Sequence, residues 1–174
     1  VLYHVFGKVF VTGILPKNNS FVLTYHYPKF GIEIIISNEG KMPIGTASGI
    51  RKAVNHFNDK PFIVVNADIW TNYLFINLMN YELETNQMAH LVLTPRPDYQ
   101  KGDFNLGDDG HIAPGSTYTF TGIGLYRPEL FIKSDEKELG SILKQNQSIK
   151  EIILYRNSKN SFQTNKNKIS GYGF

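Results

Sequence analysis

One carboxylate stands out by its place along the chain. Asp68 comes just after the apolar run FIVVN, residues 62–66. Such runs are typical of strands buried on both faces, and open α/β sheets bind ligands beyond the carboxyl ends of their strands. A carboxylate there can hold Mg²⁺ beside a phosphate, because Mg²⁺ takes oxygen ligands, typically one or two carboxylates plus substrate phosphates. The same residue could instead cap a following helix, and the strand context leaves both readings open.

A second segment, GTASGIRKA, combines glycines with small polar residues at the start of a predicted helix. Glycines allow the backbone to approach a ligand closely, and the first N–H groups of a helix attract polar or anionic groups. The segment is not a P-loop, because the Gly-Lys-Ser/Thr ending is absent. Taken alone, it is better read as a tight turn into a helix.

Two further segments carry weaker signals. FTGIGLY, residues 120–126, has two glycines inside a predicted strand, which indicates either close approach of a ligand or a bulge. GDFNL, residues 102–106, places Asp103 in a polar loop, where it either contacts a substrate or is simply solvated. The 5 histidines are scattered and none pairs at a metal-binding spacing.

The elements that must position these residues follow from hydrophobic periodicity. We predict strands at 21–27, 32–37, 62–66, 89–94 and 118–126, and helices at 46–57, 73–84, 128–131 and 136–144. Alternation of strands and helices favours a three-layer α/β domain with a mostly parallel sheet and right-handed crossovers. After Lys144 the chain becomes polar and rich in Asn and Lys, and we predict no element there.

Composition bounds the class of protein. The chain has 174 residues, of which 41% are hydrophobic and 19% charged, enough for one folded domain spanning 1–174. The absence of cysteine excludes disulfides, thiol catalysis and Cys-ligated zinc, and it agrees with a cytoplasmic location. The net charge of +3 comes without a dense basic run, so neither nucleic acid nor a membrane is expected as a partner. The apolar N-terminal stretch is too short and too interrupted for a membrane span.

Together and in this order, four segments resemble the sugar-1-phosphate nucleotidyltransferase family. They are FGIEIIISNEGKMPIGTASGIRKA, PFIVVNADIWTNY, HLVLTPRPDYQKGDFNL and FTGIGLYRPELF, and they lie between about Lys29 and Phe131. The likeness is greatest to the N-acetylmuramate-1-phosphate uridylyltransferases and the mannose-1-phosphate guanylyltransferase-like proteins. The resemblance implies a GT-A, Rossmann-like α/β/α domain, a role in nucleotide-sugar and cell-wall synthesis, and transfer of a nucleotidyl group from a nucleoside triphosphate, UTP favoured, to a sugar-1-phosphate.

The resemblance also implies residue roles. Asp68 would be the catalytic first ligand of Mg²⁺, in a pattern usually written N-G-D, with Ala67 here in place of the glycine. The expected nucleotide-binding residues are Gly45, Thr46, Ser48 and Asn66. The expected sugar-binding residues are Asp103, Thr121, Gly122 and Ile123.

Two expected parts of the family pattern are not found. The family opens with a glycine-rich signature that wraps the triphosphate, and residues 1–28 do not match it. It also supplies a second metal-binding Asp after a Trp near its C-terminus, whereas Trp70 is the single Trp here. We therefore expect an incomplete domain of low activity. Two alternatives remain, a non-catalytic sugar-phosphate-binding remnant of the same fold and an unrelated α/β interaction domain. A sheet edge left exposed would favour pairing into a homo-oligomer.

Overall fold

The computed structural model describes residues 2–5, 8–13, 33–39, 42–96, 101–146, 149–154 and 163–164. The strand predicted at 21–27 lies outside these residues. No helix in the described part is long and apolar enough to cross a membrane.

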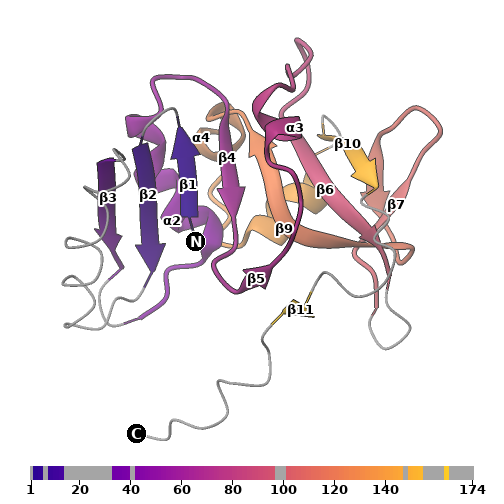
Figure 1. Ribbon diagram of the computed structural model, residues 1–174, viewed down its shortest axis with the longest axis horizontal. Helices are drawn as coiled ribbons and strands as arrows, with labels where there is room; N and C mark the ends of the chain where they lie inside the picture. Colours follow the sequence, from indigo (N-terminus) through magenta and orange to yellow (C-terminus); the bar gives the residue numbers. More distant parts are fainter. Residues whose placement is uncertain are drawn as a thin grey trace, which may run out of the picture.

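A large sheet organises the described chain, with strands in the order β10-β6-β9-β4-β1-β2-β3 (Figure 1). These strands are β1 (Leu2–Val5), β2 (Lys8–Gly13), β3 (Glu33–Asn38), β4 (Phe62–Val65), β6 (Ala89–Pro95), β9 (Tyr118–Tyr126) and β10 (Ile149–Leu154). The predicted strands at 32–37, 62–66, 89–94 and 118–126 thus form within one or two residues of their expected bounds.

The sheet was expected to be mostly parallel, but most neighbouring strands in it pair antiparallel. Only β2–β3 and β6–β10 pair in parallel among the described strands, and the other pairs are antiparallel. Two residues separate β1 from β2, too few for a parallel crossover. Strand β9 runs against both β4 and β6. It follows that β2, β3, β4, β6 and β10 all point the same way, so their carboxyl ends share one edge of the sheet.

One face of the sheet is covered by helices. They are α2 (Thr46–Ala53), its 3₁₀ continuation η2 (Val54–His56), α4 (Glu129–Ile132) and α5 (Leu139–Gln145). Figure 1 shows α2 and α4 behind the strands. Phe62 and Val64 of β4 point to this side, and Phe62 stacks on Phe57 with ring centroids 4.2 Å apart. Full burial of one such ring contributes about 1.5–3 kcal/mol, so this face is the main core.

The opposite face takes the alternate residues of the same strands, as the two-residue period of a strand requires. Ile63 of β4, Val92 of β6 and Leu125 of β9 form a second cluster with Tyr73 and Leu78. The segment that follows β4 therefore lies against the sheet on this side.

The helix predicted at 73–84 was wrong: only the single turn α3 (Ile76–Met79) forms. Tyr73, Phe75, Leu78, Tyr81 and Leu83 all pack on the second cluster. Residues 73 and 75 would point in nearly opposite directions on a helix, since successive residues are about 100° apart. Packing both on the sheet requires an irregular path, and tertiary burial outweighs helical propensity here.

Seven of the described strands were not predicted: β1, β2 and five short or late strands. β7 (Phe104–Leu106) and β8 (Ile112–Pro114) form a hairpin where we expected a loop, and Phe104 also pairs with Tyr118 of β9. Beyond Lys144, β10 joins the main sheet and β11 (Gln163–Thr164) pairs with β5 (Ile69–Trp70). Strands β5, β7, β8 and β11 have only two or three residues each, too few to show a periodic pattern in the sequence.

Candidate functional site

Asp68 stands at the shared carboxyl edge of the sheet. Strand β4 ends at Val65, and Asp68 occupies a turn before β5, with its side chain exposed. The alternative of a helix cap does not hold, because α3 begins at Ile76 with Phe75 as its N-cap and no side-chain cap bond. The structure thus presents this carboxylate to solvent where the strand pattern placed it.

The segment after Asp68 is held by the second core cluster. The backbone N–H of Tyr73 donates to Thr71 Oγ1 at 3.0 Å, and the Tyr73 and Phe75 rings meet edge to face at 5.6 Å. Burial raises the pKa of the Tyr73 phenol, against a smaller opposing effect of its hydrogen bond with Asn77. Tyr73 is therefore uncharged at neutral pH. Its burial in the second cluster fixes the chain that follows the Asp68 turn.

Strand β9 brings the predicted residues together. The backbone N–H of Asn66 donates to the Gly122 carbonyl at 2.9 Å, which fastens the start of the Asp68 turn to β9. Asp103 Oδ2 accepts from the Phe120 N–H at 3.0 Å, and the Asp103 N–H donates to the Tyr118 carbonyl at 2.7 Å. Strand β6 occupies the other edge of β9. The Asp68 turn and Asp103 are therefore successive neighbours along one edge of the same strand.

Two predicted sugar-binding residues are engaged in the core. Ile123 is fully buried in the second cluster. Thr121 is 8% exposed, and its hydroxyl donates to the Val92 carbonyl at 2.7 Å. Ile123 therefore packs in the core, and Thr121 satisfies the buried Val92 carbonyl.

Thr121→Val is expected to destabilise the fold by about 1 kcal/mol, the usual net contribution of one buried hydrogen bond. Urea unfolding followed by circular dichroism measures it. Thr119→Val on the same strand is the matched control, because the buried Thr119 hydroxyl has no hydrogen-bond partner in the described part. An equal loss in both variants would show that the Thr121–Val92 bond contributes nothing.

The predicted nucleotide-binding residues at the start of α2 are placed against another loop. Gly45 is the N-cap, with φ of +90°, and the N–H groups of Ala47 and Ser48 both point at the Lys137 carbonyl, at 2.9 and 3.4 Å. A Cβ at Gly45 would lie 2.5 Å from the same oxygen. These two N–H groups are not available to an anion, so the geometry agrees with the tight-turn reading. Thr46 follows Gly45 and is half-buried.

The described residues near Asp68 offer few ligands for a metal ion. The described residues hold no group of three or more His, Cys, Asp or Glu side chains that could bind one. Asp68 nevertheless has the chemistry of a magnesium ligand, an exposed carboxylate oxygen at an edge where phosphates could reach it. A divalent ion here would depend on one protein carboxylate and on the phosphates of a substrate.

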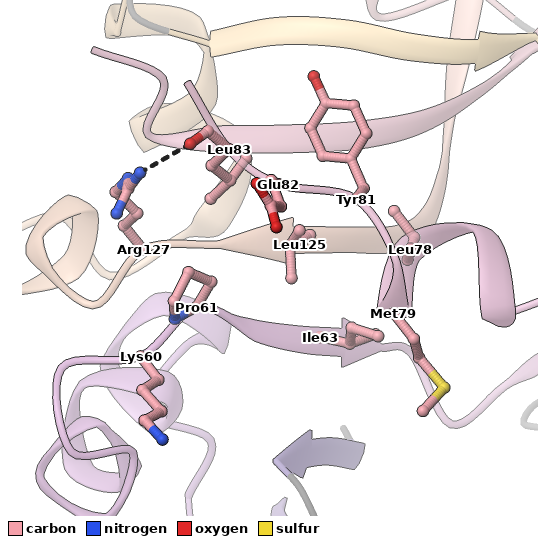
Figure 2. A pocket seen from close by; sticks show the side chains of 10 residues that line it. All are labelled: Lys60, Pro61, Ile63, Leu78, Met79, Tyr81, Glu82, Leu83, Leu125 and Arg127. Atoms are coloured by element: carbon pink, nitrogen blue, oxygen red, sulfur yellow. Dashed lines mark hydrogen bonds between the residues drawn. The ribbon is translucent and has the colours of Figure 1, made fainter. Parts of the chain in front are cut away.

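A cavity of about 320 Å³ lies at the opposite end of β4. Figure 2 shows its apolar walls, formed by Ile63, Leu83 and Leu125, and the bond from Arg127 to the Leu83 carbonyl. Arg127 also donates to the carbonyls of Gln87 and Glu84. Lys60 and Pro61 line the cavity at the amino end of β4, whereas Asp68 follows the carboxyl end of that strand. The cavity is therefore separate from the Asp68 turn. Sequence patterns missed it because distant segments line it.

The comparison with curated proteins finds a relative of this chain in sequence. The chain is 36% identical over 122 residues to an N-acetylmuramate alpha-1-phosphate uridylyltransferase of Neisseria meningitidis serogroup B. The match covers 66% of this chain and 52% of the relative, so the chain spans about half the length of the curated relative it matches. No family model matches the chain.

Solved structures share the fold at low sequence identity. HddC from Yersinia pseudotuberculosis superposes with a TM-score of 0.62 at 13% identity, over 85% of this chain and 70% of that one. A putative glucose-1-phosphate thymidylyltransferase from Bacillus anthracis gives 0.61 at 17%, over 83% and 67%. The inositol-1-phosphate CTP transferase of T. maritima gives 0.62 at 13%, over 82% and 64%. The predicted resemblance is confirmed in sequence by the curated relative and in fold by these structures.

Proposed function

We propose, from the premise that this chain is related to the sugar-1-phosphate nucleotidyltransferases, that it carries part of a site for nucleotidyl transfer. The substrates are a nucleoside triphosphate, with UTP favoured, and a sugar-1-phosphate. UTP is supported by the name of the curated relative, a uridylyltransferase. The observation that carries the proposal is the exposed Asp68 carboxylate at the carboxyl edge of the sheet.

The reaction asks the protein for positioning rather than covalent chemistry. A phosphate oxygen of the sugar-1-phosphate forms a bond to the α-phosphorus, and the bond from that phosphorus to the bridging oxygen breaks, so pyrophosphate leaves with the electron pair. Alignment of the two substrates and neutralisation of phosphate charge account for most of the rate in such transfers. Mg²⁺, held by Asp68, would supply that neutralisation when bound.

The other predicted residues have matching places in this proposal. Asp103, which hydrogen-bonds to β9 next to the Asp68 turn, would contact the sugar. Asn66, at the start of the turn, would contact the nucleotide from beside Gly122. Gly45, Thr46 and Ser48 contribute by shaping the start of α2. We further propose the layered α/β/α arrangement and cytoplasmic location of a nucleotide-sugar enzyme, with neither nucleic acid nor a membrane as partner.

A pyrophosphate-release assay with Mg²⁺, UTP and N-acetylmuramate-1-phosphate tests the function. We expect slow turnover from this chain alone, because a single carboxylate is a weak metal site and each missing transition-state contact costs about 2.7–4 kcal/mol. Replacing UTP with CTP, GTP, ATP or dTTP tests the choice of base. Rapid turnover would contradict the low activity, and turnover without divalent metal would contradict the mechanism.

A second candidate is favoured by the absence of a three-residue ligand group in the described part. The domain would then bind the sugar phosphate without catalysing transfer. Isothermal calorimetry separates the two candidates. Binding of N-acetylmuramate-1-phosphate with no Mg²⁺-dependent binding of UTP supports the remnant, whereas Mg²⁺-dependent binding of UTP supports the enzyme.

A further inference from the structure

The turn that carries Asp68 packs on Gly122 of β9. Besides the hydrogen bond from the Asn66 N–H to its carbonyl, two side chains lie over its Cα. A Cβ built at Gly122 would be 2.6 Å from Asn66 Nδ2 and 2.9 Å from Ile69 Cδ1. These two residues flank Asp68 on either side, so both ends of the turn rest on one glycine.

Glycine is required at this position for two separate reasons. Its φ of +81° lies in the left-handed region, which residues other than glycine rarely adopt. The space that a methyl group would need is also filled, and separations under 3.0 Å are closer than real Cβ contacts allow. The atoms that would have to give way belong to the side chains on either side of Asp68. A methyl group would therefore first shift the ends of the Asn66 and Ile69 side chains, and with them the packing of the turn on β9.

We infer that Gly122 is a positioning residue for Asp68: its missing side chain forms the socket in which Asn66 and Ile69 seat the metal-binding turn. This rests on the proposed role of Asp68. It also gives a different reason for the glycine than the close approach of a sugar, because the protein's own side chains occupy the space above it.

A double-mutant cycle tests the socket, with Gly122→Ala, Asn66→Ala and the two combined. The probe is Mn²⁺ titrated in the presence of excess UTP, because a divalent ion at Asp68 depends on substrate phosphates as well. The paramagnetic broadening of the backbone amide signals of residues 66–69 is followed by NMR. We expect the Mn²⁺ Kd to rise about fivefold or more in Gly122→Ala. Asn66→Ala removes the atom nearest to the methyl group, whereas the Ile69 contact and the positive φ remain. The increase in Kd caused by Gly122→Ala should therefore be at most about half as large in the Asn66→Ala background, a coupling expected only between contacting residues.

Gly110→Ala is the control for backbone strain alone. Gly110 has φ of +79°, and a Cβ there meets nothing within 4 Å. It should leave the Mn²⁺ Kd unchanged. A Kd unaltered by Gly122→Ala, or raised equally with and without the Asn66 side chain, overturns the inference.

The inference and the proposed function fail in different ways. If the wild type broadens no more than Asp68→Asn, then Asp68 binds no metal and the proposed function fails. The socket is then judged by hydrogen exchange at the amide of residue 66, which donates to Gly122. That amide should exchange at least about tenfold faster in Gly122→Ala and partly recover in the double variant, and unchanged exchange overturns the socket.

Discussion

Asp68→Asn is expected to weaken Mg²⁺-dependent binding of UTP by roughly 10- to 140-fold and to abolish the slow pyrophosphate release. The substitution keeps the size of the side chain and removes its negative charge, so the divalent ion loses its protein ligand. Interactions with a charged group are typically worth about 1.5–3 kcal/mol, and each 1.4 kcal/mol is about tenfold in affinity. Calorimetry with and without Mg²⁺ measures the change.

Two comparisons make this result specific. Stability should change by less than about 0.5 kcal/mol, because Asp68 is exposed and makes no cap. Asp108→Asn removes another exposed carboxylate, in the β7–β8 turn, and should leave UTP binding unaltered. Equal binding of Mg²⁺ and UTP by Asp68→Asn and the wild type would remove the basis of the enzyme proposal.

Gly45→Ala is expected to destabilise the fold by about 2–4 kcal/mol. Gly45 has φ of +90° and ψ of 148°, a region that is essentially restricted to glycine, so another residue there costs about 1–3 kcal/mol. The new methyl group would also lie 2.5 Å from the Lys137 carbonyl, the oxygen toward which the N–H groups of Ala47 and Ser48 point. Moving that oxygen leaves the start of α2 without its partner, which adds about 1 kcal/mol or more. Chemical denaturation measures the total.

Gly110→Ala is again the informative partner, because it has the positive φ without the crowding. Its cost should be about 1–2 kcal/mol, and the excess in Gly45→Ala reports the Lys137 contact together with the ψ of 148° at Gly45. If Gly45→Ala instead keeps native stability and loses UTP affinity, the nucleotide-contact reading is right and the structural reading is wrong. Both quantities can be measured on the same protein sample.

Local sequence was informative about elements and about Asp68. The apolar run at 62–66 became β4, and the carboxylate after it is exposed beyond the end of that strand. The helical spacing from residue 46 became α2 and η2. These features depend on side-chain type and spacing among near neighbours, which a sequence displays directly. The resemblance of four segments in register then pointed to the family, and the curated relative agrees with it.

The surroundings of Asp68 depended on contacts between distant parts of the chain. No local pattern shows that β9 would run antiparallel beside β4, that Lys137 would face the start of α2, or that Asn66 would rest on Gly122. The same limit explains the lost helix at 73–84, whose apolar residues are spaced for a sheet surface that the segment meets only after folding. Side-chain type and spacing encode which elements form, whereas the partner that satisfies a backbone group or fills a space is chosen by packing of the whole domain.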